Sequence, residues 1–431
     1  MKQTHVFKGT IVHSLSPTEL KIIERGALVV DEHGKIIEVT QKIDFKTYPN
    51  CIIHDFKDKI ICPGFIDLHV HLPQYAFVGQ GADELLAWLE KYTFPAEKRF
   101  ENSEFAGNCS AIFFDELLSY GTTTAAVYPT LHKEATDIAF GYAAHLGLRL
   151  IMGKVLMDQN SPTGLTEDTE KGMDESVELL EKWHGFDNHR IQYAFTPRFA
   201  ITCSERSMQK VGDAAKKYNV FIQTHLSENR GELEAVKSFF PKAKSYADVY
   251  YSSGILTEKT LLAHCIYLSE TEKNYLKETG AVPVHCPTSN RFLQSGVFPF
   301  RKNEAEGLTI GLGSDVAGGY ELSMLHEMKE AIEMSKVNNI IHYQDKQNVL
   351  SQNEAFYYGT LGGAKAIGMD HIIGNFETGK EADFLVLDDS EINPFNDFDF
   401  YQETEHRISR LIYRSSKSCV KAVYIRGKRL K

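Results

Sequence analysis

The chain has 431 residues, of which 42% are hydrophobic and 24% are charged, a composition typical of a globular protein with a large buried core. Its net charge of −11 and the lack of a basic cluster argue against a surface that binds nucleic acid or an anionic membrane. Its apolar runs are shorter than the ~18 residues that a membrane span needs, and the first residues lack the apolar core of a secretion signal.

Short β-strands are predicted near the amino terminus and again near the carboxyl terminus. Three stretches within residues 5–62 alternate apolar and polar positions, and the sequence DEHGK supplies a turn. The same pattern returns in residues 382–388 and 419–431. We expect the two ends to pair as a small flanking β-sandwich domain made of residues 1–62 and 375–431.

The middle of the chain, residues 63–374, alternates short apolar runs with longer helical patterns. We expect core strands at residues 63–71, 121–130, 149–157, 190–199, 219–225, 260–265, 281–286 and 308–315. Between them, apolar residues spaced three and four apart predict helices, among them residues 82–92, 108–121, 207–218 and 323–337. Eight such alternations predict an α/β fold, a parallel (β/α)8 barrel like that of triosephosphate isomerase (TIM), rather than an open sheet.

Two histidines stand at the end of the first predicted barrel strand, in the sequence PGFIDLHVH. Side chains alternate along a strand, so His69 and His71 point to one side and Val70 points to the other. In a barrel that side is the interior, and the carboxyl ends of barrel strands carry the active sites of such enzymes. Two converging imidazoles suit a zinc-like ion, although an isolated H-x-H pair is more often structural.

Other predicted strands end in residues of the same kind. His225 ends the fifth strand, with Glu228 three residues further on, and His264 ends the sixth. Asp315 ends the eighth strand and is followed by glycines, which let the backbone turn close to a ligand. Each position alone is compatible with a purely structural role. Together with the histidine pair they predict a metal site at the carboxyl ends of the strands.

This constellation resembles the amidohydrolase superfamily, metal-dependent hydrolases built on a (β/α)8 barrel with a flanking β-sandwich. The resemblance extends over nearly the whole chain, from GTIVHS through PGFIDLHVH to GKEADFLVLD. Within the superfamily, LLAWLEKYTFPAEKRF and TPRF resemble the branch that deaminates guanine. The resemblance implies hydrolysis of a C–N bond in a cyclic amidine, with guanine converted to xanthine and ammonia in purine catabolism.

The resemblance also implies one Zn2+ per chain, with Fe2+ as the alternative metal, held by His69, His71, His225 and Asp315. Binuclear members of the superfamily bridge two ions with a carboxylated lysine on the fourth strand. That strand here, HRIQYAFTPRFA, has no interior lysine near its end, and Lys154 lies one strand earlier. We therefore expect a mononuclear site and a structural or indirect role for Lys154.

By the same resemblance, the catalytic residues are Glu228, His264 and Asp315. Asp315 would accept the proton of the attacking water, and His264 would hydrogen-bond the nucleophile. Glu228 would carry one proton to the ring and another to the leaving ammonia. Taken alone, Glu228 is equally typical of a surface carboxylate in a polar loop.

The resemblance places a larger set of residues at the base: His71, Gln74, Trp88, Arg198, Phe199, His225, Glu228 and Asp315. Gln74 has donors and acceptors that suit a purine edge, and Arg198 would donate to O6 and N7. Phe199 would pack on or beside the ring. Trp88 lies in an i, i+3, i+4 apolar pattern, so packing in the core is an equal alternative to lining the pocket.

Alternative functions differ in substrate or in class. Related barrels hydrolyse cytosine, adenine, triazines, hydantoins or imidazolones with much the same metal set, but Gln74, Arg198 and Phe199 suit a purine with an O6 acceptor. A metal-free assembly scaffold is disfavoured because every ligand position is filled. A zinc deaminase of the other fold would need H-x-E with P-C-x-x-C, which the sequence lacks.

The pattern of cysteines indicates the cellular compartment of the protein. All seven are scattered without a C-x-x-C pair, which is typical of reduced thiols in a cytoplasmic protein. We expect a small purine base, guanine, as the partner, and neither nucleic acid nor a membrane. The resemblance implies a homodimer.

Overall fold

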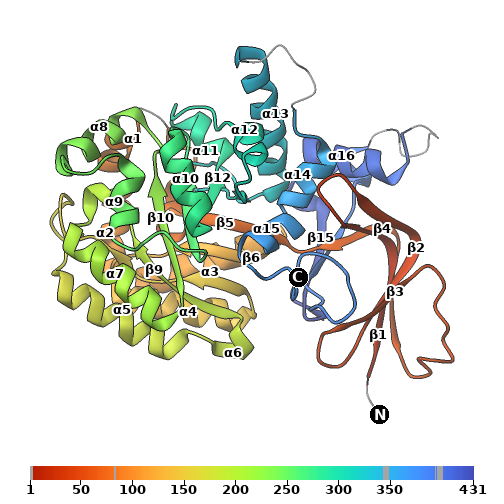
Figure 1. Ribbon diagram of the computed structural model, residues 1–431. Helices are drawn as coiled ribbons and strands as arrows, with labels where there is room; N and C mark the ends of the chain where they lie inside the picture. Colours follow the sequence, from red (N-terminus) through yellow and green to blue (C-terminus); the bar gives the residue numbers. More distant parts are fainter. Residues whose placement is uncertain (1–2, 82–83, 343–348, 394, 396–400) are drawn as a thin grey trace.

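The computed structural model describes residues 3–81, 84–342, 349–393, 395 and 401–431, and it contains two sheets (Figure 1). One sheet is a ring of parallel strands surrounded by helices, and the other is formed by the two ends of the chain. The predicted α/β fold, a barrel with a flanking β-domain, is therefore confirmed. Residues 82 and 83 of the predicted helix 82–92 lie outside the described residues. Among the described residues, none of the helices is long and apolar enough to cross a membrane.

The barrel strands follow the predicted order. They are β5 (Phe65–His71), β6 (Thr122–Tyr128), β7 (Arg149–Met152), β8 (Val155–Leu156), β9 (Ile191–Pro197), β10 (Phe221–Leu226), β11 (Thr260–His264), β12 (Val282–His285) and β13 (Gly311–Leu312). The third predicted strand is split at Gly153, where a Cβ would lie 1.8 Å from the carbonyl oxygen of Ala194. The ring closes where Asp315 N donates to His69 O at 2.7 Å and His71 N donates to Val316 O at 3.1 Å.

Most of the helices cover the outside of the ring, and the last one, α16 (Thr404–Arg414), lies beside the flanking sheet. They are α1 (Leu85–Trp88), α2 (Phe94–Lys98), α3 (Ser103–Ser119), α4 (Lys133–Leu146), α5 (Thr169–Trp183), α6 (Phe186–His189), α7 (Glu205–Tyr218), α8 (Arg230–Phe239), α9 (Tyr246–Ser252), α10 (Glu270–Thr279), α11 (Pro287–Phe292), α12 (Phe300–Ala305), α13 (Met324–His342), α14 (Gln352–Tyr358), α15 (Leu361–Ala366) and α16 (Thr404–Arg414). Short 3-10 helices are η1 (Leu72–Phe77), η3 (Arg99–Glu101), η4 (Ala200–Thr202), η6 (Ser390–Ile392) and η7 (Lys417–Cys419), and η2 (Leu89–Thr93) is a π-helix.

Capping residues determine where several of these helices begin and end. Ser204 accepts a hydrogen bond from Ser207 N at the start of α7, and a capping box of Ser269 and Glu272 starts α10. Gly280 ends α10 in the left-handed conformation that glycine adopts most readily. The predicted helix 82–92 is instead interrupted, because η2 is a π-helical turn between α1 and α2.

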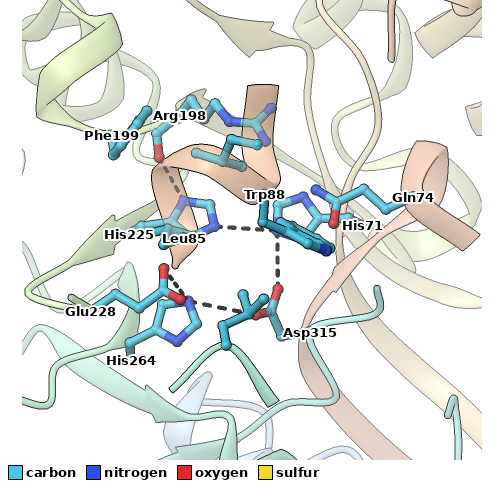
Figure 2. A pocket seen from close by; sticks show the side chains of 12 residues that line it. His71, Gln74, Leu85, Trp88, Arg198, Phe199, His225, Glu228, His264 and Asp315 are labelled. Carbon is cyan, nitrogen blue, oxygen red and sulfur yellow. Dashed lines mark hydrogen bonds and ion pairs between the residues drawn. The ribbon is translucent and has the colours of Figure 1, made fainter. Parts of the chain in front are cut away.

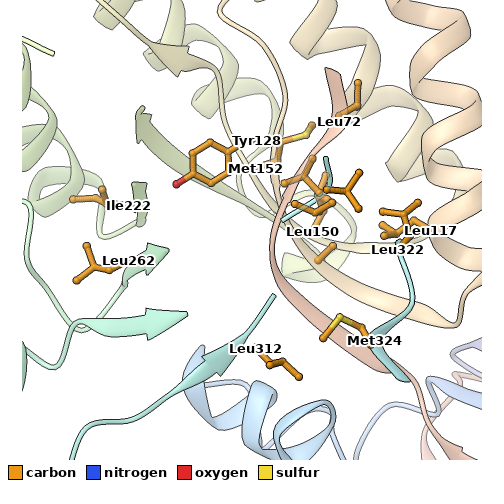
Figure 3. Close-up of a cluster of buried hydrophobic side chains, with 14 of the residues drawn as sticks. Leu72, Leu117, Tyr128, Leu150, Met152, Ile222, Leu262, Leu312, Leu322 and Met324 are labelled. Atoms are coloured by element: carbon orange, nitrogen blue, oxygen red, sulfur yellow. The ribbon is translucent and has the colours of Figure 1, made fainter. Parts of the chain in front are cut away.

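The hydrophobic core joins the strands to the helices around them. Figure 3 shows part of it, with Leu150, Ile222 and Leu262 contributed by three different strands. Leu117 of α3 and Met324 of α13 extend the same cluster outward. The ring is therefore a packed core, and only its carboxyl-terminal end is available for chemistry.

The flanking sheet contains β1 (His5–Ser14), β2 (Leu20–Val30), β3 (Ile36–Thr40), β4 (Ile52–Pro63), β14 (Phe384–Leu387), β15 (Val420–Ile425) and β16 (Lys428–Arg429). Its strands run in the order β16-β15-β14-β4-β1-β2-β3, so β4 joins the two ends of the chain. We propose residues 1–62 and 375–431 as one domain and 63–374 as the other. Helix α16 was not predicted.

A buried ionic network fastens the flanking sheet to the barrel at the amino-terminal ends of the strands. Arg149, the first residue of β7, lies 2.7 Å from Glu381. Arg190, just before β9, contacts Glu381 at 2.5 Å and Asp383 at 3.0 Å. Because charges buried in this way are stable only when paired, the network ties the two units together at the end of the barrel opposite the candidate site.

Candidate active site

Four predicted metal ligands converge at the carboxyl ends of the strands, and Figure 2 shows three of them, His71, His225 and Asp315. His71 Nε2 lies 3.2 Å from both His69 Nε2 and His225 Nε2. Asp315 Oδ1 lies 3.1 Å from His69 Nε2 and 3.2 Å from His71 Nε2. All four side chains are buried, and their ligand atoms lie within 4.8 Å of one another. Tetrahedral ligands at about 2.0–2.1 Å from an ion lie about 3.3 Å apart, so the set fits one divalent cation.

The protonation of these histidines also suits a cation. Burial lowers the pKa of His71 to about 3 and the pKa of His225 well below its usual range, so both imidazoles are neutral. His225 Nδ1 donates to the carbonyl oxygen of Arg198 at 2.7 Å, which leaves the lone pair on Nε2. Burial works to raise the pKa of Asp315, but the neighbouring His69 and His71 hold it well below its usual value. The set therefore combines neutral nitrogen ligands with one carboxylate.

A residue that the sequence did not single out aligns two of these ligands. Asp67 Oδ1 accepts hydrogen bonds from the backbone N–H groups of His69 at 3.1 Å and Ser314 at 3.0 Å, and Ser314 Oγ donates to its Oδ2 at 2.5 Å. Burial raises the pKa of Asp67 to about 6. Asp67 thus holds the end of β5 against the loop that carries Asp315. The sequence feature that could have identified Asp67 is its position within PGFIDLHVH, two residues before His69.

His264 and Glu228 lie beside the ligand set. His264 Nδ1 donates to Asn290 Oδ1 at 2.8 Å, so its Nε2 faces the site, 3.3 Å from Glu228 Oε2 and 3.6 Å from Asp315 Oδ2. Ser295 Oγ donates to Glu228 Oε1 at 3.1 Å. Burial, and then the charge of Asp315, raise the pKa of Glu228 above its usual value. A carboxyl group of raised pKa near a nucleophile position is suited to proton transfer.

The backbone at the strand ends is strained in a way typical of active sites. His264 and Asp315 have φ angles of 73° and 47°, in the left-handed region that residues other than glycine rarely adopt. Ser227, next to Glu228, has a φ of 53°. These conformations turn the chain immediately after each strand, so that the side chains meet above the ring.

A pocket of about 370 Å³ opens above this group. It is lined by His71, Gln74, Leu85, Trp88, Leu89, Arg198, Phe199, His225, Glu228, His264, Leu293 and Asp315. Trp88 has both of the roles considered from the sequence, packing in the core and lining the pocket. It lines the pocket, and it also packs on Phe77 at 5.6 Å between ring centroids while its Nε1 donates to Gln80 O at 2.8 Å. The structure thus brings every predicted site residue to the pocket or to the ligand set beneath it.

The pocket has two chemically different ends. In Figure 2 the guanidinium of Arg198 and the carboxamide of Gln74 lie at one end, and Glu228, His264 and Asp315 lie at the other. Gln74 Oε1 accepts from Ala317 N at 3.2 Å. Arg198 Nη1 donates to both carboxylate oxygens of Glu97, at 2.7 and 2.6 Å. One end therefore offers fixed hydrogen-bonding groups and the other offers the ligand set and proton-transfer groups.

Two further observations concern residues outside the predicted set. The ring of Tyr128 packs against the rings of His69, His71 and His225, with centroid distances of 4.7, 4.6 and 5.0 Å, and so covers the ligand set on one side.

Lys154 is buried and forms ion pairs with Glu167 and, at 3.6 Å, with Glu175. Strand β9 contains no lysine, so the position of a bridging carbamate is not filled.

Comparisons with known proteins identify a family and several similar proteins. Residues 60–430 match the amidohydrolase family. The guanine deaminase of Escherichia coli is 41% identical over 372 residues, 86% of this chain and 82% of that protein, and the guanine deaminase of Mus musculus is 37% identical over 99% of this chain and 96% of its own length. A crystal structure of guanine deaminase from C. acetobutylicum with guanine bound in its active site is 35% identical, covers 99% of this chain and 100% of its own, and has a TM-score of 0.93.

Proposed function

The chain belongs to the amidohydrolase family as a hydrolase of C–N bonds in cyclic amidines, and from this premise we propose that it deaminates guanine to xanthine and ammonia. The observation that carries the proposal is the two-ended pocket. It sets Arg198 and Gln74 opposite Glu228 and His264, so a flat base would meet hydrogen-bonding groups at one edge and the reacting groups at the other.

The recognition end suits guanine in particular. Within the described ranges, Arg198 makes its side-chain hydrogen bonds through Nη1 alone, which leaves Nε and Nη2 for acceptors on a ligand. Guanine offers two acceptors, O6 and N7, that a guanidinium engages together. Phe199 and Trp88 supply apolar and aromatic surface for the ring.

We propose that His69, His71, His225 and Asp315 hold one Zn2+, with Fe2+ as the alternative, since three imidazoles and a carboxylate suit either metal. A divalent cation held there supplies hydroxide at neutral pH, because coordination lowers the pKa of water from about 15.7 to about 7.

The residues around this position divide the proton transfers. Asp315 would accept the proton of the attacking water, and His264, whose Nε2 lies 3.6 Å from Asp315 Oδ2, would hold the nucleophile. Glu228, beside His264, would deliver one proton to ring nitrogen N3. It would then take up the proton that Asp315 accepted from water and deliver it to the amine at C2 as ammonia leaves. The proton of the new C2 hydroxyl group would restore the carboxyl group of Glu228 as the carbonyl forms. Ser295 keeps that carboxyl group in place.

The metal content is the first prediction. Because β9 contains no lysine to bridge a second ion, purified protein should bind one tightly held divalent ion per chain. Elemental analysis after dialysis measures the stoichiometry, and stepwise removal and return of metal relates it to activity. Two tightly held ions per chain, both needed for turnover, would contradict the mononuclear site.

The substrate is tested by incubating the metal-loaded protein with guanine, adenine or cytosine and measuring ammonia. We expect guanine to be deaminated and adenine to be essentially inert, because its amine is at C6 and it presents a donor where guanine has O6. Faster turnover of adenine or cytosine than of guanine would overturn the substrate and leave only the hydrolase class.

We also propose a homodimer located in the cytoplasm. All seven cysteines are free thiols in the structure, which suits a reducing compartment. Ile340 and Ile341, at the end of the projecting helix α13, are 81% and 60% exposed, as expected of a surface that a partner covers. Light scattering measures the mass, and a monomer at all concentrations would contradict the dimer.

A further inference from the structure

Glu97, which lies outside the pocket lining, is placed to control the recognition end of the pocket. It sits on α2, and only 4% of its surface is exposed. Both of its carboxylate oxygens accept from Arg198 Nη1, and Oε1 lies 3.5 Å from Gln74 Nε2. One buried carboxylate therefore contacts the two residues that face the O6 edge of the proposed substrate.

We propose that Glu97 is a positioning residue that sets the preference for a purine with an acceptor at C6, by fixing Arg198 and Gln74 in one arrangement. The inference rests on the proposed function. A long arginine side chain has many rotamers, and a charge-assisted contact to both carboxylate oxygens restricts them. With Nη1 occupied by Glu97, the guanidinium presents its remaining N–H groups in a fixed direction.

The surrounding contacts restrict the same two residues from other sides. The guanidinium carbon of Arg198 lies 5.5 Å from the centroid of the Phe94 ring, three residues before Glu97 on α2. Gln74 is fixed through its other atom, because Oε1 accepts from Ala317 N at 3.2 Å. The carboxamide is thus held between a backbone N–H and Glu97, and its orientation is set by the pair.

Charge balance supports the same role. Arg198 and Glu97 are both buried, with 3% and 4% of their surface exposed, and their opposite charges pair in the interior. The pair leaves the recognition end without net charge, which suits a neutral base. Because this end lies away from Glu228, His264 and Asp315, loosening it should weaken binding and selectivity more than the proton transfers.

The test compares guanine with 2-aminopurine, which carries the same amine at C2 but lacks O6. In the wild type we expect guanine to be preferred in kcat/KM by about 5- to 150-fold, the effect of leaving a buried donor unpaired. Glu97→Gln keeps the shape and removes the charge. It should raise KM for guanine about tenfold, lower kcat less than about threefold, and reduce the guanine preference about fivefold.

Two variants separate positioning from general stability. Glu272→Gln makes the same change at a carboxylate that is 5% exposed and hydrogen-bonds Ala247 N and Ser269 N, outside the pocket lining. It should lower the melting temperature and leave the guanine preference unchanged. Glu97→Asp keeps the charge and should restore part of the preference; it also supplies the readout if Glu97→Gln fails to fold.

A Glu97 variant that melts earlier but keeps the wild-type preference overturns the inference, because Glu97 would then serve only the fold. The inference is also overturned if Glu97→Gln lowers the guanine preference by the same factor in a protein that already carries Arg198→Ala as it does in the wild type. A wild type that releases no ammonia from guanine overturns the proposed function and this inference together. Guanine turnover with an unchanged preference in the variant overturns the inference alone.

Discussion

Glu228→Gln should lower kcat for guanine by about 10²- to 10⁴-fold, the usual contribution of general acid–base catalysis, while the protein keeps its metal. The reason is that Glu228 lies outside the set of ligand atoms and only faces it, 3.3 Å from His264 Nε2. A glutamine can still accept from Ser295 Oγ and fill the same volume, but it cannot receive and return a proton. The proposed reaction needs that transfer twice, once at the ring and once at the leaving amine.

Turnover of guanine measured beside the metal content of the same sample separates this role from loss of the site. Glu272→Gln is the matched control, since it changes a buried carboxylate that does not line the pocket and should keep a rate near that of the wild type. A Glu228→Gln protein with metal bound and a rate near that of the wild type would rule out Glu228 as the proton carrier.

The parts of the site that could be predicted are those fixed by strand periodicity. His69 and His71 share a side because side chains alternate, and His225, His264 and Asp315 each end an apolar run, so barrel geometry brings them to one rim. The fold followed from the same alternation of runs and helical patterns. These are local signals, each readable within about ten residues of sequence.

The residues that were missed depend on contacts between distant segments. Glu97 follows a π-helical turn, and nothing in its neighbours distinguishes a carboxylate that is buried against Arg198 from one that faces solvent. Asn290 and Ser295 lie in the segment after β12 and meet His264 and Glu228 only once the ring has closed. Trp88 could not be assigned because packing and pocket lining demand the same apolar spacing, and the structure gives it both.

Arg198 connects the two ends of the pocket through different atoms. Its side chain binds Glu97 and faces the pocket, and its backbone carbonyl accepts from His225 Nδ1 at 2.7 Å. The carbonyl orients a predicted metal ligand, His225, regardless of the side chain attached to it. We therefore expect a change of the Arg198 side chain to alter substrate recognition and to leave His225 in the form proposed for a metal ligand, which makes this position suited to a test of specificity.

Arg198→Ala should lower kcat/KM for guanine on the order of 10²-fold, because hydrogen bonds from a charged donor contribute about 1.5–3 kcal/mol and about 1.4 kcal/mol corresponds to tenfold. The loss also leaves Glu97 buried without its partner, which adds to the effect on the recognition end. The metal should stay bound, since all four ligands and the carbonyl that orients His225 are retained. Steady-state kinetics with guanine and metal analysis of the same preparation measure both.

Arg301→Ala is the control for loss of a paired arginine, because Arg301 binds Glu304 and Glu354 at 2.7 Å each and lies outside the pocket lining. It should keep kcat/KM for guanine near that of the wild type. Arg198→Ala should not acquire adenine deaminase activity, because removing a donor mismatch at C6 does not bring the amine of adenine to the reacting groups, which face C2. If Arg198→Ala instead kept its activity on guanine, the O6 contact would be wrong and another group would have to select the base.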